Sequence, residues 1–184
     1  MNTDNATLDP CIDPSPPPAT LGLFAMLRED VACVFKRDPA ARSTLDDLAT
    51  GHFERIIPDA SVDPPKARRV ILCSGKVYYD LLKARTDRAI DDVALVRLEQ
   101  LYPLRRDEIR GVLAPYPRAT EVAWCQEEPW NMGAWYFVNA RLRAMLDGRL
   151  SARCICRAES ASPATGSKAS HDLEQQQLID EALT

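Results

Sequence analysis

The sequence predicts an α/β fold in which a mostly parallel sheet carries helices on both faces. Two observations lead to this prediction. After residue 69, four short apolar segments are each followed by a segment with the spacing of an amphipathic helix. The apolar segments are nearly continuous rather than alternating, which is typical of strands buried on both faces. Parallel neighbours need crossover connections, and the helical segments provide them.

The four units follow one another along residues 69–184, which we assign to one domain. The first joins the apolar run VILCSG at 70–75 to the helical segment KVYYDLLKAR, and the second joins DVALVRLEQLYPL at 92–104 to RRDEIRGVLAPY. The third joins TEVAWCQEEP to GAWYFVNARLRAML, and the fourth joins LSARCICRAES to an amphipathic helix near 168–183. Each unit therefore supplies one strand and one covering helix.

The N-terminal part has a different character. Residues 1–20 hold five of the 14 prolines and little periodic hydrophobicity, so we expect a disordered tail. Residues 21–42 contain apolar positions at helical spacing until Pro39, which predicts one short helix. Residues 43–68 include a short turn that Ser43 or Thr44 can cap and a stretch with three prolines from Pro58 to Lys66, so we expect a linker entering the domain.

The composition excludes several classes of protein. With 184 residues, 46% hydrophobic and 27% charged, the chain is expected to form one globular domain with tails. The formal net charge of -4 gives no basic field for nucleic acid or an acidic membrane surface. No apolar run is long enough to span a bilayer, and the first twenty residues lack a secretory signal. We therefore expect a cytoplasmic protein with no nucleic-acid or membrane partner.

The six cysteines are expected to be reduced and mostly buried. They include no CxxC pair, and most lie inside apolar runs. Cys154 and Cys156 would share one face of a strand, but no histidine or second cysteine pair lies at the spacing that zinc requires. We expect no metal site.

Polar residues follow each predicted strand, where ligands bind in open parallel sheets. After the first strand, Gly75 can form a tight turn, and Lys76 opens a helix whose backbone N–H groups attract anions. The corner could therefore hold a phosphate, or it could be a capped turn with a solvated lysine.

The stretch WCQEEPWNMGAW, residues 124–135, contains all three tryptophans of the chain. Glu127 and Glu128 cannot form an acid–base pair on one substrate atom, because neighbouring strand residues point to opposite faces. One carboxylate is expected to hold a neighbouring loop or an arginine, while Gly133 fixes the route of the loop. Trp130 and Trp135 are candidates for a contact with another surface, although the tryptophans could equally fill the core of this domain. We take Gln126, Glu127, Glu128, Trp130, Asn131, Gly133 and Trp135 as interface or loop-structuring residues.

Nothing in the sequence indicates catalysis by the chain alone. His52 and His171 have no serine or cysteine partner at a recognised spacing. There is no Gly-rich phosphate fingerprint, P-loop, nucleophile elbow or zinc-helix motif. We therefore assign no catalytic residue.

Four motifs carry a resemblance to a known family. RVILCSGKVYYDLL, VALVRLEQLYPL, WCQEEPWNMGAWYFV and SASPATGSKASHDLEQQQLIDEAL follow one another in order. Over residues 43–184 the chain resembles the C-terminal domain of the thiamine-diphosphate-dependent decarboxylating component of the 2-oxoglutarate dehydrogenase complex, an oxidoreductase of the tricarboxylic acid cycle. The resemblance implies a transketolase C-terminal-like fold, a role in dimer formation, and association with itself or with a subunit of the complex.

The resemblance also implies which ligands this domain binds. In the family, thiamine diphosphate and magnesium are held by preceding domains through a Gly-Asp-Gly and a distant Asn, and this chain has no Gly-Asp-Gly. We expect no bound cofactor and no decarboxylation by the chain alone. Some members bind acetyl coenzyme A or AMP on this domain, and by matching position Lys76 and Arg110 would contact the phosphates.

Two departures from the family leave alternatives open. RAESA stands where the family usually has Arg-Pro-Ala-Ser-Ala, which places Ala158 and Glu159 in that loop. Residues 27–42 faintly resemble the N-terminal helical region of serine acetyltransferases, so we expect a truncated or fused reading frame. The hypotheses are a non-catalytic association and regulatory domain, an enzyme fragment active only with a separate thiamine-binding chain, and a free-standing nucleotide-binding sensor.

Overall fold

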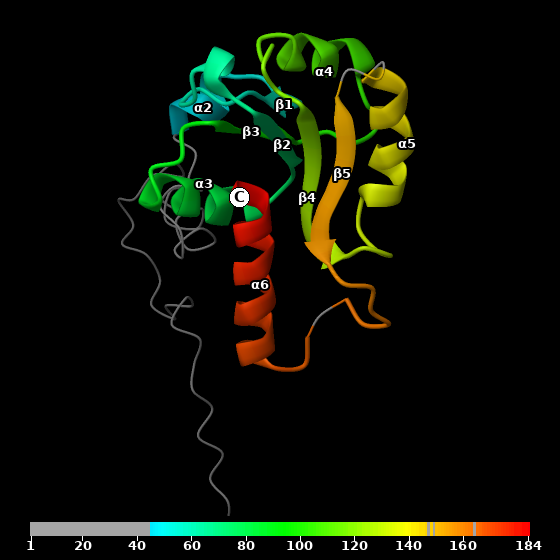
Figure 1. Ribbon diagram of the computed structural model, residues 1–184. Coiled ribbons are helices and arrows are strands. Elements are labelled where there is room, and N and C mark those ends of the chain that lie inside the picture. Colours follow the sequence, from blue (N-terminus) through cyan, green and yellow to red (C-terminus); the bar gives the residue numbers. More distant parts are fainter. Residues whose placement is uncertain (1–44, 147, 149, 164) are drawn as a thin grey trace, which may run out of the picture. The chain divides into compact units, whose positions relative to one another are not determined.

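The computed structural model describes residues 45–146, 148, 150–163 and 165–184 (Figure 1). The chain divides into two compact units, Met1–His52 and Phe53–Thr184. In the first unit the described helix is α2 (Leu45–Thr50), where the sequence indicated a short turn. The disordered tail, the helix and the acetyltransferase-like stretch expected within residues 1–42 lie outside the described residues, so these expectations stay predictions.

The second unit is built on a five-stranded sheet with the strand order β1-β3-β2-β4-β5. Its strands are β1 (Ile56–Ile57), β2 (Arg69–Cys73), β3 (Val93–Leu98), β4 (Glu121–Pro129) and β5 (Ser151–Arg157). β2 pairs in parallel with β3 and β4, and β4 with β5, while β1 pairs antiparallel with β3. The sheet is therefore mostly parallel, as the four strand–helix units predict.

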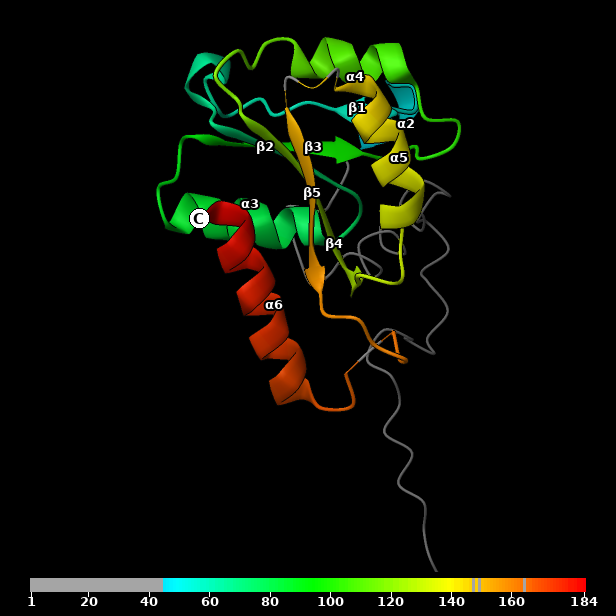
Figure 2. The same ribbon diagram turned by 45° about the vertical axis from the view of Figure 1, so that its right-hand side comes forward.

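Two helices cover each face of the sheet (Figures 1 and 2). They are α3 (Val77–Asp87), α4 (Arg106–Leu113), α5 (Trp135–Met145) and α6 (Lys168–Leu183). Buried residues of α4 and α5 belong to one apolar cluster, and those of α3 and α6 belong to the other. The predicted α/β fold class is confirmed.

The central strand explains why its apolar run is continuous. In β2, Val70 and Leu72 belong to the α4–α5 cluster, whereas Ile71 and Cys73 belong to the α3–α6 cluster. All four are at most 1% exposed. Because successive strand residues point to opposite faces, a strand covered on both sides must be apolar at every position.

Residues 53–68 are part of the domain rather than a linker, and the sequence did not indicate β1. Asp59, just after β1, forms a buried ion pair with Arg85 of α3 and accepts a hydrogen bond of 2.7 Å from the backbone N–H of Leu95. The side chains of Asp59 and Arg85 are 3% and 5% exposed. The short 3-10 helix η2 (Pro64–Lys66) then leads into β2. Tertiary contacts thus fix a proline-containing segment that local pattern alone describes as irregular.

Candidate functional site

The carboxyl edge of the sheet gathers most of the residues that the sequence singled out. The loops after β2, β4 and β5 meet there, together with the N-terminal half of α6 (Figure 2). We describe in turn the loop between β4 and α5, the aromatic side chains around it, and the charged groups between α3 and α6.

Gln126 organises the loop between β4 and α5. Its side-chain oxygen accepts hydrogen bonds from the Trp124 indole N–H (2.9 Å) and from the Trp135 backbone N–H (3.0 Å). Its amide nitrogen donates to the carbonyl oxygens of Met132 (2.8 Å) and Pro129 (3.2 Å). Gln126 is only 4% exposed, so this buried amide satisfies backbone groups that the loop would otherwise leave without partners.

Gly133 allows the backbone to approach this glutamine. Its φ of +68° lies in the left-handed region, where a side chain is strained. A Cβ atom built at this position would lie 2.7 Å from Nε2 of Gln126. Glycine is therefore required at this position for two reasons: the positive φ and the close contact with the Gln126 side chain.

Asn131 joins this loop to the loop after β5. Its side-chain amide donates to the Ser160 carbonyl (3.0 Å) and accepts from the Ser160 N–H (3.1 Å). The Trp130 N–H donates to the Arg157 carbonyl at 2.9 Å. Two loops that are about thirty residues apart in sequence are thus held side by side.

The three tryptophans have different environments. Trp124 and Trp135 are 2% and 3% exposed and belong to the α4–α5 cluster, so both fill the core of this domain. Trp130 is 39% exposed, and its ring packs edge-on against Tyr136 with the ring centres 5.2 Å apart. The core alternative therefore applies to Trp124 and Trp135, whose indoles are buried, whereas a contact of Trp130 with another surface stays a prediction.

Trp130 belongs to a larger aromatic group, which we call the aromatic patch and which comprises the exposed residues Tyr102, Trp130 and Tyr136 and the partly buried Phe137. Tyr102 is 80% exposed and Tyr136 57% exposed. Tyr102 packs against Phe137 with the ring centres 6.3 Å apart. Tyr136 and Phe137 are consecutive residues in the first turn of α5, so both ring pairs lie at the start of this helix.

Lys76 has two carboxylates of its own domain as partners. Its ammonium lies 2.7 Å from Asp80 and 3.3 Å from Glu127. Gln175 of α6 donates to both carboxylates at 2.9 Å. Burial opposes the charged form of the lysine, but Asp80 and Glu127 outweigh it and raise the pKa of Lys76 above its ordinary value. The corner that could attract an anion therefore already contains negative charge.

Arg110 lies elsewhere. It is on α4, which covers the face of the sheet opposite to α3, and its Nε donates to the Met145 carbonyl at 3.4 Å. Lys76 lies at the start of α3, on the other face. The structure of one chain does not bring these two cations together.

Glu127 and Glu128 also have separate environments. Glu127 is partly buried and holds Lys76 and Gln175, while the residue Glu128 is exposed. Of these two glutamates, it is Glu127 whose carboxylate joins Asp80 in the contacts with Lys76 and Gln175.

The described cysteines are buried or partly buried thiols. Burial raises the pKa of Cys73 to about 12, and it raises the pKa values of Cys125, Cys154 and Cys156 as well. None of these four cysteines forms a disulfide. Among the described residues no three His, Cys, Asp or Glu side chains are grouped as a metal ion would require.

Comparison with known proteins shows the family. A sequence model described as 2-oxoglutarate dehydrogenase C-terminal matches residues 42–183. The chain belongs to this family. The chain is 41% identical to the 2-oxoglutarate dehydrogenase E1 component of Cupriavidus necator over 174 residues, which covers 88% of this chain and 18% of the relative. It is 44% identical to the E1 component of Azotobacter vinelandii over 152 residues, covering 80% of this chain and 16% of the relative.

A eukaryotic relative gives the same result. The mitochondrial 2-oxoglutarate dehydrogenase of Caenorhabditis elegans is 43% identical over 180 residues, covering 88% of this chain and 17% of the relative. The chain thus spans about one sixth of the length of the curated relatives it matches, and the resemblance found in the sequence is confirmed. None of the helices in the described part of the chain is long and apolar enough to cross a membrane.

Proposed function

We propose that this chain is an association domain of the 2-oxoglutarate dehydrogenase decarboxylating component and that it docks onto a second copy of itself through the aromatic patch. The exposure of Tyr102, Trp130 and Tyr136 is the observation that carries the proposal. Aromatic side chains are enriched at the centres of protein interfaces, where they bury large areas at low entropic cost. The hydrogen bonds around Gln126 and Asn131 hold the backbone beneath the patch in place.

The size of the patch is appropriate for an interface. Since a large aromatic residue offers about 150–250 Å², the exposed fractions of Tyr102, Trp130 and Tyr136 correspond to roughly 400 Å² of surface. That area is comparable to the largest patch on a typical monomer, and such patches are often functional. Two copies meeting through it would bury about 800 Å², roughly half of a standard interface of about 1,600 Å². The surrounding polar residues would supply the rest.

Light scattering after size-exclusion chromatography tests the proposal across a range of chain concentrations. The double variant Trp130→Ala, Tyr136→Ala should shift the association equilibrium toward the monomer by at least tenfold, since interface aromatics often contribute more than about 1 kcal/mol each. Leu173→Ala is the matched control, because Leu173 is 60% exposed on α6 and lies outside the patch. Thermal melts should show that all variants remain folded.

Two results of the light-scattering experiment would contradict docking through the aromatic patch. Wild-type chain that is monomeric at the highest concentration contradicts self-association, and binding to purified subunits of the dehydrogenase complex then tests the other expected partner. A double variant that associates like the wild type rules out this patch as the docking surface. The cytoplasmic location expected from the sequence stays a prediction.

We further propose that the chain does not decarboxylate 2-oxoglutarate alone. Its sequence has no Gly-Asp-Gly, and the described residues bring together no set of three acidic, His or Cys side chains for magnesium. Thiamine diphosphate and magnesium would then be held by parts of the relatives outside the matched region. Purified chain with added cofactors should show no 2-oxoglutarate-dependent dye reduction. Activity that appears only with a separate thiamine-binding chain would favour the enzyme-fragment alternative.

Effector binding at Lys76 and Arg110 is a separate hypothesis. The Lys76 side chain is 66% exposed and accessible, but Asp80 and Glu127 compete for its charge. Calorimetric titration with acetyl coenzyme A and with AMP tests it. If the hypothesis holds, Lys76→Ala and Arg110→Ala should each weaken binding. No heat at millimolar ligand would reject it, together with the nucleotide-sensor alternative.

A further inference from the structure

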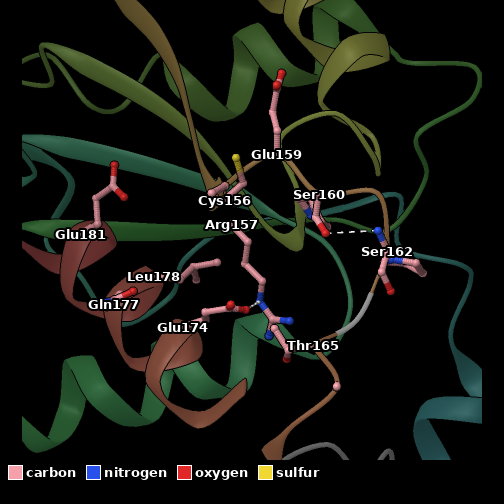
Figure 3. Close-up of a pocket in the computed structure, with 14 residues that line it drawn as sticks. Cys156, Arg157, Glu159, Ser160, Ser162, Thr165, Glu174, Gln177, Leu178 and Glu181 are labelled. Carbon is pink, nitrogen blue, oxygen red and sulfur yellow. Dashed lines mark hydrogen bonds and ion pairs between the residues drawn. The ribbon is translucent and has the colours of Figure 1, made fainter. Parts of the chain in front are cut away.

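A pocket of about 580 Å³ lies between α6 and the loop that follows β5 (Figure 3). The end of β5 contributes Arg157, the loop contributes Glu159 and Thr165, and α6 contributes Glu174 and Glu181. This pocket is distinct from the aromatic patch, and none of the sequence motifs assigns a ligand to it.

Two buried polar atoms in the wall of this pocket have no hydrogen-bond partner among the described residues. They are Nε of Arg157 and Oγ1 of Thr165. The Arg157 side chain is 9% exposed, and its Nη2 bonds His171 and Gln175 at 3.1 Å. Leaving a buried donor without an acceptor is unfavourable, so a ligand that supplies one is stabilised by it.

The neighbouring carboxylate determines what kind of acceptor fits. Glu174 lies 3.6 Å from Nε of Arg157, beyond hydrogen-bond distance (Figure 3). An amide group has a carbonyl that can accept from Nε and an N–H that can donate to Glu174. A bare anion would lack the N–H and would be repelled by the carboxylate. The geometry therefore favours a peptide group.

Charge determines which side chain the peptide carries. The lining residues include three glutamates, namely Glu159, Glu174 and Glu181, against one arginine. Glu181 forms an ion pair with Arg153 at 3.1 Å, and Glu174 forms one with Arg157. No ion-pair partner is found for the Glu159 carboxylate in the described part of the chain. Acidic walls concentrate cations.

We propose that this pocket binds an extended peptide segment carrying a lysine or arginine side chain. The peptide amide is held by Arg157, Thr165 and Glu174, and the basic side chain extends toward Glu159. Figure 3 shows Arg157, Glu174 and Thr165 close together, with Glu159 and Glu181 farther from them on two different sides. The proposal depends only on the pocket and is independent of self-association through the aromatic patch.

Isothermal titration of the full 184-residue chain with three capped peptides tests this site. The probes are acetyl-Gly-Arg-Gly-amide, acetyl-Gly-Glu-Gly-amide and acetyl-Gly-Gly-Gly-amide, with inorganic phosphate as a fourth. The arginine peptide should bind most tightly, and its affinity should fall as salt is added, because charge contributes to the contact.

Two variants separate the contributions of charge and hydrogen bonding. Glu159→Gln should weaken the arginine peptide about threefold to fivefold, as expected for one exposed charge pair. Thr165→Val should weaken all peptides about fivefold through the lost hydroxyl. It should not lower the melting temperature, since that hydroxyl has no hydrogen-bond partner among the residues that the structure describes. Glu128→Gln is the control, because Glu128 is exposed on β4 and does not line the pocket.

The proposal is overturned by any of four results. The first is the absence of binding heat at an arginine-peptide concentration of about 5 mM, which is on the order of the weakest specific dissociation constants. The second is equal binding of the acidic and basic peptides, and the third is a peptide affinity that neither Glu159→Gln nor Thr165→Val changes. The fourth is tighter binding of phosphate than of any peptide. Peptide binding by a chain that stays monomeric would support this site while contradicting docking through the aromatic patch.

Discussion

Replacing Gly133 by alanine should destabilise the domain far more than the same change at Gly75. Both glycines have a positive φ, +68° at Gly133 and +73° at Gly75. A left-handed conformation costs a residue with a Cβ about 1–2 kcal/mol, and the smaller entropy of the unfolded alanine chain offsets about 0.4–1 kcal/mol. These contributions are common to both positions and cancel in the difference.

The difference comes from Gln126. At Gly75 nothing lies within 4 Å of an added Cβ, whereas at Gly133 the Gln126 amide lies 2.7–2.9 Å away. The amide must move, and it is buried with partners on the Trp124 indole and the Trp135 N–H. Losing two such bonds in the interior costs about 2–6 kcal/mol, since unsatisfied buried groups cost about 1–3 kcal/mol each. Gly133→Ala should therefore be less stable than Gly75→Ala by about that amount.

Urea denaturation followed by tryptophan fluorescence measures the two free energies of unfolding. The slope should be the same for both variants, so that the difference in midpoints reports stability. A double variant Gln126→Ala, Gly133→Ala provides a further check, because removal of the amide leaves the new methyl group nothing to displace. Equal losses for Gly133→Ala and Gly75→Ala would refute the close approach to Gln126.

Two other predictions concern buried ionisable groups. Burial opposes ionisation of Asp59, but hydrogen bonds from Arg85 and from the Leu95 N–H outweigh it, so the pKa of Asp59 lies below its ordinary value of 3.8. Its ionised form therefore contributes stability above the unfolded pKa that is lost as the pH falls through the folded pKa. Asp59→Asn should lower the free energy of unfolding by about 3–5 kcal/mol at pH 7 and by progressively less below pH 4. Urea denaturation midpoints at pH 7 and below pH 4 measure this difference. A loss of stability that does not change with pH would contradict the ion pair between Asp59 and Arg85. Because burial raises the pKa of Cys73 to about 12, iodoacetamide at pH 8 should leave this thiol unmodified in the native chain and should label it in urea. Peptide mass mapping measures the labelling. Equal labelling in the two conditions would contradict the burial of Cys73.

The sequence predicted the parallel part of the sheet because the signal is local. Runs such as VILCSG are apolar at every position, and the structure places alternate residues of this run in different apolar clusters. β1 gives no such signal. It has two residues, and its position depends on pairing with β3 and on the ion pair between Asp59 and Arg85, whose partners are 26 residues apart in sequence.

In the candidate site, too, features set by local sequence pattern could be predicted, and features set by tertiary contacts could not. The period of a strand predicts different environments for the neighbouring glutamates, and Glu127 is partly buried whereas Glu128 is exposed. Which tryptophan is exposed depends on where the loop turns, and Gln126 and Gly133 determine that turn through contacts that no periodicity shows. The sequence places polar residues after β5, but it did not indicate the pocket there, because the pocket walls come from three elements.

The position of α6 is fixed by residues more than one hundred positions earlier. The last turn of α6 contains no basic residue that could interact with its C-terminal carbonyl groups. Arg69 donates to the Glu181 and Ala182 carbonyls at 3.1 Å and 2.9 Å, and Arg68 donates to the Thr184 carbonyl at 2.7 Å. Both arginines place positive charge at the negative end of the helix dipole.

This arrangement connects the segment that enters the sheet with the pocket that α6 helps to form. Because the N-terminal half of α6 contributes Glu174 to the pocket and Gln175 to the Lys76 contacts, a shift of the helix would alter both. Arg69 also contacts Glu121, at 2.6 Å, so its loss would remove one of the two ion pairs that this carboxylate forms with described residues, the other being with Arg153. Arg68 and Arg69 therefore hold the C-terminal end of α6, and the contacts that Glu174 and Gln175 make near its N-terminal end depend on the position that these arginines give the helix.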